Sequence, residues 1–216
     1  MDFETWRPIY KEILADLGYS EEEDERSAGE LARLLHENKW YTPLDDLRDA
    51  ISGKHIVITG GGITDEDISR LPPGRIIATG RSIPLLLKYS ITPFAIVTDL
   101  DGDLDAQKLQ CERGSIPVIH AHGNNIHLLP EVKNFPRRGI GTCQCRPIPP
   151  LHNFGGFTDG DRAAALAAEM HAARIILAGF RFDNPVPDTE NKRKKLAWAE
   201  KIIGILSARI EILYLR

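Results

Sequence analysis

The segment Phe94-Ala95-Ile96-Val97-Thr98-Asp99-Leu100-Asp101-Gly102-Asp103 joins an apolar run to three alternating aspartates. A short apolar run that ends at turn-forming residues is typical of a strand buried on both faces, as the strands of parallel sheets are. In such sheets ligands bind beyond the carboxyl ends of the strands. The segment therefore predicts a buried strand over residues 94–98, followed by aspartates at a position where a site is expected.

Five more β-rich runs surround this segment, mostly with helical patterns between them: residues 55–59, 75–79, 117–121, 174–178 and 210–214. Strands that alternate with helices predict an α/β fold, in which helices cover both faces of a mostly parallel sheet. Polar or glycine-rich segments follow five of the strands, at residues 60–62, 80–82, 99–103, 122–125 and 179–183. We expect a functional site where these ends converge.

The first 52 residues have a different pattern. Apolar residues recur at helical spacing from Trp6 to Leu17, Gly18 stops the run, and the pattern returns around Leu31 and Leu35. We therefore expect an N-terminal helical cap over residues 1–52 and a catalytic domain over residues 53–216. The charge run at residues 21–26 predicts a solvated helix.

Composition restricts the partners and the compartment. The chain of 216 residues has 27 Lys and Arg against 31 Asp and Glu, a net charge of −4, so there is no basic field to attract nucleic acid. The three cysteines do not form a disulfide framework, which fits a reducing cytoplasm. The N-terminus lacks the features of a signal peptide and no apolar run reaches roughly 18 residues, so we expect no membrane association.

Asp99, Asp101 and Asp103 form the first candidate site. In an extended segment residues two apart point to the same side, which brings three carboxylates into one small volume. Their repulsion is relieved most simply by a divalent cation, and hard oxygen ligands favour Mg²⁺ or Mn²⁺. The alternative is an acidic turn in water. An EF-hand is excluded because Gln110, not Glu, stands at the twelfth position of the loop.

The second candidate precedes an alanine-rich helix that begins near Ala163. Thr158 or Asp159 is expected to cap this helix, whose free amides would attract phosphate. Asp159 and Asp161 oppose an anion unless a cation or Arg162 intervenes, which again favours metal-bound phosphate. The alternative is that both carboxylates only cap the helix and complement its dipole.

The third candidate is the basic run at residues 192–195, at the start of the last long helix. Cations do not complement the helix dipole there, whereas phosphate oxygens would explain them. Lys192 and Lys195 are the expected pair on one face, and a solvated basic face is the alternative. His120 and His122 follow a strand and either bond the backbone or take part in catalysis.

Three segments resemble the archaeal 6-hydroxymethyl-7,8-dihydropterin diphosphokinase (MptE-like) family: residues 98–102 (TDLDG), 120–125 (HAHGNN) and 153–163 (NFGGFTDGDRA). Residue 124 is Asn where that family usually has Asp. The resemblance implies a Rossmann-like core similar to thiamin pyrophosphokinase. It also implies Mg²⁺-dependent transfer of diphosphate from ATP to the hydroxymethyl group of the dihydropterin, with release of AMP, in tetrahydromethanopterin or folate-type pterin biosynthesis.

With this resemblance, we assign Asp99, Asp101 and Asp161 to Mg²⁺. Asp159 joins Asp161 at a second metal or orients the first, and His122 is the remaining catalytic candidate. The residues expected to bind ATP or the pterin are Gly61, Gly80, Arg81, Asn125, Gly156, Thr158, Arg162, Lys192 and Lys195. The expected partners are small molecules, and the oligomeric state is open, with a homo-oligomer as one option.

Two alternatives stay open from the sequence. The Asp99-x-Asp101 pair also resembles the acidic pair with which metal-dependent glycosyltransferases hold a nucleotide sugar. Asn124, in place of a carboxylate, is also compatible with a protein that binds a nucleotide or pterin without turning it over.

Overall fold

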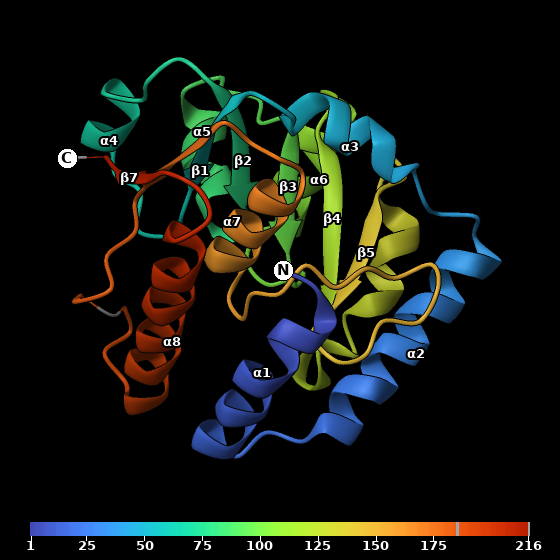
Figure 1. Ribbon diagram of the computed structural model, residues 1–216. Coiled ribbons are helices and arrows are strands. Elements are labelled where there is room, and N and C mark those ends of the chain that lie inside the picture. Colours follow the sequence, from blue (N-terminus) through green and yellow to red (C-terminus); the bar gives the residue numbers. More distant parts are fainter. Residues whose placement is uncertain (185, 216) are drawn as a thin grey trace.

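The computed structural model describes residues 1–184 and 186–215. Its centre is one seven-stranded, all-parallel sheet with the strand order β5-β4-β3-β2-β1-β6-β7 (Figure 1). The strands are β1 His55–Thr59, β2 Arg75–Thr79, β3 Ala95–Thr98, β4 Ile116–Ala121, β5 Ile140–Cys143, β6 Arg174–Ala178 and β7 Ile212–Tyr214. The predicted α/β, Rossmann-like architecture is therefore confirmed.

The sequence pattern missed one strand, β5. Its residues Ile140-Gly141-Thr142-Cys143 are too few and too mixed to show a period. The strand forms because β4 pairs with it and because α2 covers it. A Cβ built on Gly141 would lie 2.4 Å from Leu35 Cδ1, so only glycine lets the helix approach this closely.

Helices cover both faces of the sheet, as expected. In Figure 1, α7 and α8 lie in front of the sheet, whereas α5 and α6 lie behind it. The helices and single turns are α1 Phe3–Leu17, α2 Glu21–Glu37, α3 Leu44–Ile51, α4 Asp65–Ser69, η1 Gly80–Ser82, α5 Ile83–Lys88, α6 Leu104–Glu112, η2 Gly123–Asn125, η3 Leu129–Asn134, α7 Asp159–Glu169 and α8 Glu190–Ser207. No helix in the described part of the chain combines the length and apolarity needed to span a bilayer.

The N-terminal helices form where the sequence pattern predicts them. Asp2 caps α1, and Gly18 ends it in the left-handed conformation with φ 68°. Trp6, Tyr10, Leu31 and Leu35 are fully buried in the same hydrophobic core as the strands. The first three helices are therefore packed on the sheet, and α2 runs beside its β5 edge (Figure 1).

Candidate active site

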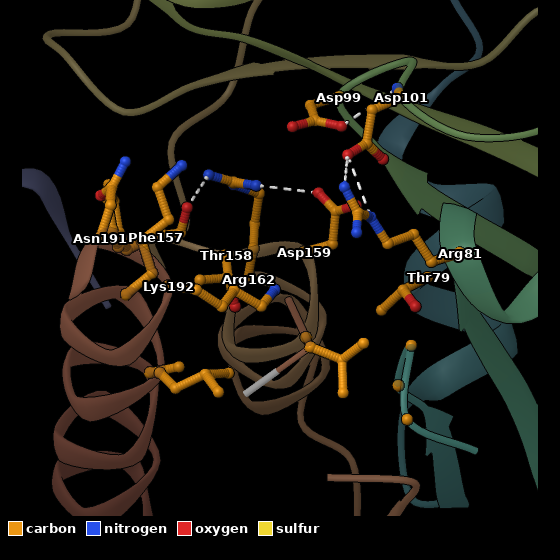
Figure 2. Close-up of a pocket in the computed structure, with 18 of the residues that line it drawn as sticks. Thr79, Arg81, Asp99, Asp101, Phe157, Thr158, Asp159, Arg162, Asn191 and Lys192 are labelled. Atoms are coloured by element: carbon orange, nitrogen blue, oxygen red, sulfur yellow. Dashed lines mark hydrogen bonds and ion pairs between the residues drawn. The ribbon is translucent and has the colours of Figure 1, made fainter. Parts of the chain in front are cut away.

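One cavity of about 560 Å³ opens at the carboxyl ends of the strands. Its lining comes from the segments that follow β1, β2, β3, β4, β5 and β6, and from the beginnings of α2, α7 and α8. This cavity therefore lies at the strand ends where the sequence predicts a functional site. Figure 2 shows Asp99, Asp101 and Arg81 on one side of it and Lys192 of α8 on the opposite side.

Three carboxylates converge in this cavity, but they are not the three that the alternating spacing predicts. Oxygen atoms of Asp99, Asp101 and Asp159 all lie within 4.8 Å of one another. Asp103 instead caps α6, where its Oδ1 accepts a hydrogen bond from the Ala106 amide at 2.9 Å. The expectation for Asp103 was wrong because the segment is not extended: Leu100 and Gly102 have φ of 69° and 85°, which turns the chain twice.

Each carboxylate of the cluster contacts one basic side chain, but the three lie close enough to repel one another. Burial, followed by the charge of Asp99, raises the pKa of Asp159 well above its ordinary value. Burial would also raise the pKa of Asp99, but hydrogen bonds from His122 and from the Asp101 amide, together with the charge of Arg162, lower it. Oxygen ligands at these separations fit a hard divalent cation such as Mg²⁺ or Mn²⁺.

Asp161 lies outside this cluster and outside the cavity lining. Its oxygens accept hydrogen bonds from the Phe157 amide at 2.6 Å, from the Thr158 amide at 2.8 Å and from the Thr158 hydroxyl. These contacts make the reciprocal cap of α7. The structure therefore brings Asp159, rather than Asp161, to Asp99 and Asp101.

His122 is placed to orient Asp99. Its Nε2 lies 3.2 Å from Asp99 Oδ2, and its Nδ1 accepts a hydrogen bond from the Asn124 amide at 3.3 Å. Because Nδ1 accepts this hydrogen bond, Nε2 is the nitrogen that donates to Asp99. His120 is fully buried, its Nδ1 contacts the Thr142 hydroxyl at 3.0 Å, and burial holds its pKa well below the ordinary value.

The basic residues divide between the cavity and the outer surface. Lys192 and Lys195 both line the cavity and so lie on one face of α8, as their spacing predicts, whereas Arg193 and Lys194 pair with acidic residues elsewhere. The ammonium group of Lys192 has no hydrogen-bond or ion-pair partner among the residues described. Burial, followed by the charges of Arg81 and Lys195, lowers its pKa. Such a cation is stabilised by an anion entering the cavity.

The other cavity cations are held by protein groups. Arg81 donates to Asp101 Oδ2 from Nε at 3.1 Å and from Nη2 at 2.7 Å. Arg162 is buried and donates to Asp159 Oδ1 at 3.2 Å and to the Phe157 carbonyl at 2.8 Å (Figure 2). The ammonium group of Lys195 lies 5.6 Å and 5.9 Å from the ring centres of Tyr19 and Phe157, so it engages aromatic faces.

Gly61 and Thr158 also line the cavity, whereas three other predicted substrate-binding residues lie behind its lining. Gly80 packs between strand ends, since a Cβ there would lie 2.7 Å from Thr98 Oγ1. Gly156, at φ 94°, lets the chain close over the backbone of α7. Asn125 donates to the Asp99 carbonyl at 2.8 Å and to the His120 carbonyl at 2.7 Å, and so supports the loop.

Sequence reasoning missed the contribution of α2. Asp24 belongs to the charge run that predicts a solvated helix, yet it is only 3% exposed and lines the cavity beside Gly123 and Gln144. Nothing in the run distinguishes this carboxylate from its exposed neighbours except its spacing from Leu31 and Leu35 on the buried face of the helix. Phe157 and Arg181 also line the cavity and were not among the predicted site residues.

Fold and site together define a doubly wound α/β protein in which a carboxylate cluster and basic side chains face one cavity. The family described as 6-hydroxymethylpterin diphosphokinase MptE-like matches residues 30–186. The chain belongs to this family.

Curated relatives cover almost the whole chain. A 6-hydroxymethyl-7,8-dihydropterin pyrophosphokinase of Pyrococcus furiosus is 41% identical over 217 residues, covering 94% of this chain and 93% of the relative. Proteins of the same name from Methanocaldococcus jannaschii and Methanothermobacter thermautotrophicus are each 36% identical. They cover 100% and 95% of this chain, and the same shares of their own lengths.

Proposed function

We propose that this protein is a 6-hydroxymethyl-7,8-dihydropterin diphosphokinase that uses ATP and Mg²⁺. The acceptor hydroxyl oxygen forms a bond to the β-phosphorus of ATP, and the bond from that phosphorus to the oxygen bridging to the α-phosphorus breaks. AMP leaves with the electron pair, and the hydroxyl proton passes to a phosphate oxygen or to water. The product would enter tetrahydromethanopterin or folate-type synthesis in the cytoplasm.

One observation carries the proposal within this family: the carboxylates of Asp99, Asp101 and Asp159 share a cavity with the unpartnered ammonium group of Lys192. Transfer of a phosphoryl-type group needs positioning and charge neutralisation more than a strong base. The contact of His122 Nε2 with Asp99 agrees with a positioning role for that imidazole.

Asp99, Asp101 and Asp159 are the residues that would hold Mg²⁺. The ion would neutralise charge on the transferred group and on the leaving AMP. The chain's own residues then orient the substrates: His122 fixes Asp99, and Arg81 fixes Asp101. Lys192 would bind polyphosphate as a point charge, which is how lysine recognises phosphate.

The proposal is tested by AMP release from ATP and Mg²⁺ with 6-hydroxymethyl-7,8-dihydropterin as acceptor, and with thiamin as the comparison. Mass spectrometry should detect the pterin diphosphate, and thiamin should give no product. AMP formed with thiamin but not with the pterin, or no AMP with either, would refute the activity.

Lys192→Ala and Arg193→Ala form a matched pair, because both remove a cation from the first turn of α8. Only Lys192 lines the cavity, while Arg193 Nε lies 2.6 Å from Asp188 on the outside. We expect Lys192→Ala to raise the KM for ATP by about 10-fold or more, the loss expected for one charge-assisted contact of roughly 1.5–3 kcal/mol. Arg193→Ala should leave it unchanged.

A further inference from the structure

We propose that Asp24, from helix α2, is a positioning residue for the cation-binding carboxylates. It fixes the loop after β4, through which His122 and Asn125 hold Asp99. This inference rests on the proposed function, since it assumes that the carboxylate cluster binds a divalent cation. It makes α2 part of the catalytic apparatus, although α2 precedes every strand in the chain.

Asp24 connects segments that are distant in sequence. Its Oδ1 accepts a hydrogen bond from the Gly123 amide at 2.8 Å. Its Oδ2 accepts from the Tyr10 hydroxyl and from Gln144 Nε2, both at 2.7 Å. The carboxylate is therefore held on one side by α1 and the end of β5, and presents its other oxygen to the loop.

The loop that Asp24 holds carries two contacts to Asp99. His122, immediately before Gly123, places Nε2 at 3.2 Å from Asp99 Oδ2. Asn125, two residues after Gly123, donates to the Asp99 carbonyl at 2.8 Å. A shift of the Gly123 amide therefore moves both groups that orient Asp99, and outer partners of this kind tune metal affinity.

The packing of α2 against the loop supports the same role. A Cβ on Gly123 would lie 2.7 Å from Glu23 Cβ, so the loop backbone runs directly against the helix. The Ser27 hydroxyl, one turn after Asp24, adds a long contact of 3.3 Å to Asn125 Oδ1. Helix α2 therefore fixes the position of the loop after β4 and its distance from the helix.

The test measures Mn²⁺ binding by electron paramagnetic resonance, together with kcat and KM for AMP release, in the full-length chain. Asp24→Ala leaves the Gly123 amide without its acceptor, and should weaken Mn²⁺ binding by roughly 10–100-fold and lower kcat to a similar extent. Asp24→Asn keeps one carbonyl oxygen able to accept from Gly123, and should give an intermediate loss. Glu25→Gln, an exposed carboxylate on the same helix, is the control for charge alone.

Two further variants separate positioning from stability. Tyr10→Phe removes a donor from the far side of Asp24, and should lower Tm while Mn²⁺ affinity stays near wild type. Gly123→Ala pushes the loop off α2 while the Asp24 side chain stays unchanged, and should reproduce the loss of Mn²⁺ affinity even if Asp24→Ala does not fold.

The outcomes distinguish the positioning role of Asp24 from the proposed diphosphokinase function. If the wild type binds Mn²⁺ and releases AMP while folded Asp24→Ala or Gly123→Ala binds Mn²⁺ equally well, the positioning role is overturned and the proposed function stands. A rise in KM for the pterin alone, with metal affinity unchanged, would make Asp24 a substrate contact and would also overturn it. If the wild type neither binds Mn²⁺ nor releases AMP, the proposed function fails, and this inference fails with it.

Discussion

The acidic segment after β3 and the acidic first turn of α7 look alike in sequence. In each segment, some carboxylates cap a helix and others face the cavity. One carboxylate of each segment caps a helix: Asp103 caps α6 and Asp161 caps α7. The others turn to the cavity, where Asp99 and Asp101 meet Asp159. Capping carboxylates and cavity carboxylates have the same residue type and the same spacing. The local backbone conformation therefore decides which of the two roles each one has.

The nearest neighbours of each carboxylate explain the difference. Burial raises the pKa of both Asp159 and Asp161. Around Asp161, amide and hydroxyl donors oppose that effect, and they satisfy the carboxylate without any ion. Around Asp159, the charge of Asp99 adds to the effect of burial. A carboxylate surrounded by donors is structural, whereas one surrounded by other carboxylates is suited to a cation.

The largest expected effect comes from removing charge on the cavity side. Asp101→Asn should reduce AMP release by about 100-fold or more, since a metal's stabilisation of transition-state charge is worth several kcal/mol. Asp103→Asn is the matched change on the capping side and should keep most of the activity, because Asn is also a good N-cap. Similar rates of AMP release for Asp101→Asn and wild type in saturating Mg²⁺ would contradict the distinction between cavity carboxylates and capping carboxylates.

The second effect should appear in stability. Asp161→Ala leaves two backbone amides and one hydroxyl at the start of α7 without their acceptor. We expect it to lower the free energy of unfolding by about 2–3 kcal/mol, measured by urea denaturation without divalent cation. A loss below ~0.5 kcal/mol would show that the cap of α7 is not important.

The sequence is sufficient to predict most strands of the sheet and the edge of the sheet at which the cavity lies. Apolar runs followed by polar or glycine-rich segments predict β1 to β4 and β6, and the rule for parallel sheets then places Asp99 and Asp101 at a cavity. This reasoning succeeds because buried parallel strands have a simple apolar signature. Strand β5 has no such signature and depends on its neighbours.

Two parts of the site were beyond the sequence for physical reasons. The positive φ of Leu100 and Gly102 turns Asp103 away from the cluster, and spacing alone does not reveal a non-glycine residue in that conformation. Asp24 acts across more than ninety residues of chain, through its contact with Gly123. Only the packing of α2 beside β5 brings those residues together.

A third, smaller effect concerns Asp159 without a cation. A raised pKa means that the ionised carboxylate is less favourable in the folded than in the unfolded chain. As pH rises above the ordinary value of 3.8, the unfolded state loses its proton first and stability falls. Asp159→Asn removes the titrating group, so urea denaturation in EDTA should show a weaker fall of stability from about pH 4 to about pH 7 than in the wild type.

Added Mg²⁺ tests directly whether Asp159 contacts the cation. It should raise the Tm of the wild type, because a ligand that binds only the folded state stabilises it. It should raise the Tm of Asp159→Asn much less. Equal Mg²⁺-induced shifts in the two proteins would place the cation away from Asp159.

The smallest expected effect belongs to Asp103, the exposed cap of α6. Asp103→Ala removes the acceptor of the Ala106 amide, which lies 2.9 Å away, and N-cap losses of this kind are typically about 1 kcal/mol. Asp103→Ser keeps an acceptor and should recover most of the loss, while Asp105→Ala, an exposed acidic residue in the first turn of the same helix, should cost only a few tenths of a kcal/mol. The decisive measurement compares urea denaturation with and without Mg²⁺: because Asp103 faces its own helix, its loss should be the same in both. If the loss of unfolding free energy grew when Mg²⁺ was added, Asp103 would have to contact the cation. The distinction between capping and cavity carboxylates would then be wrong.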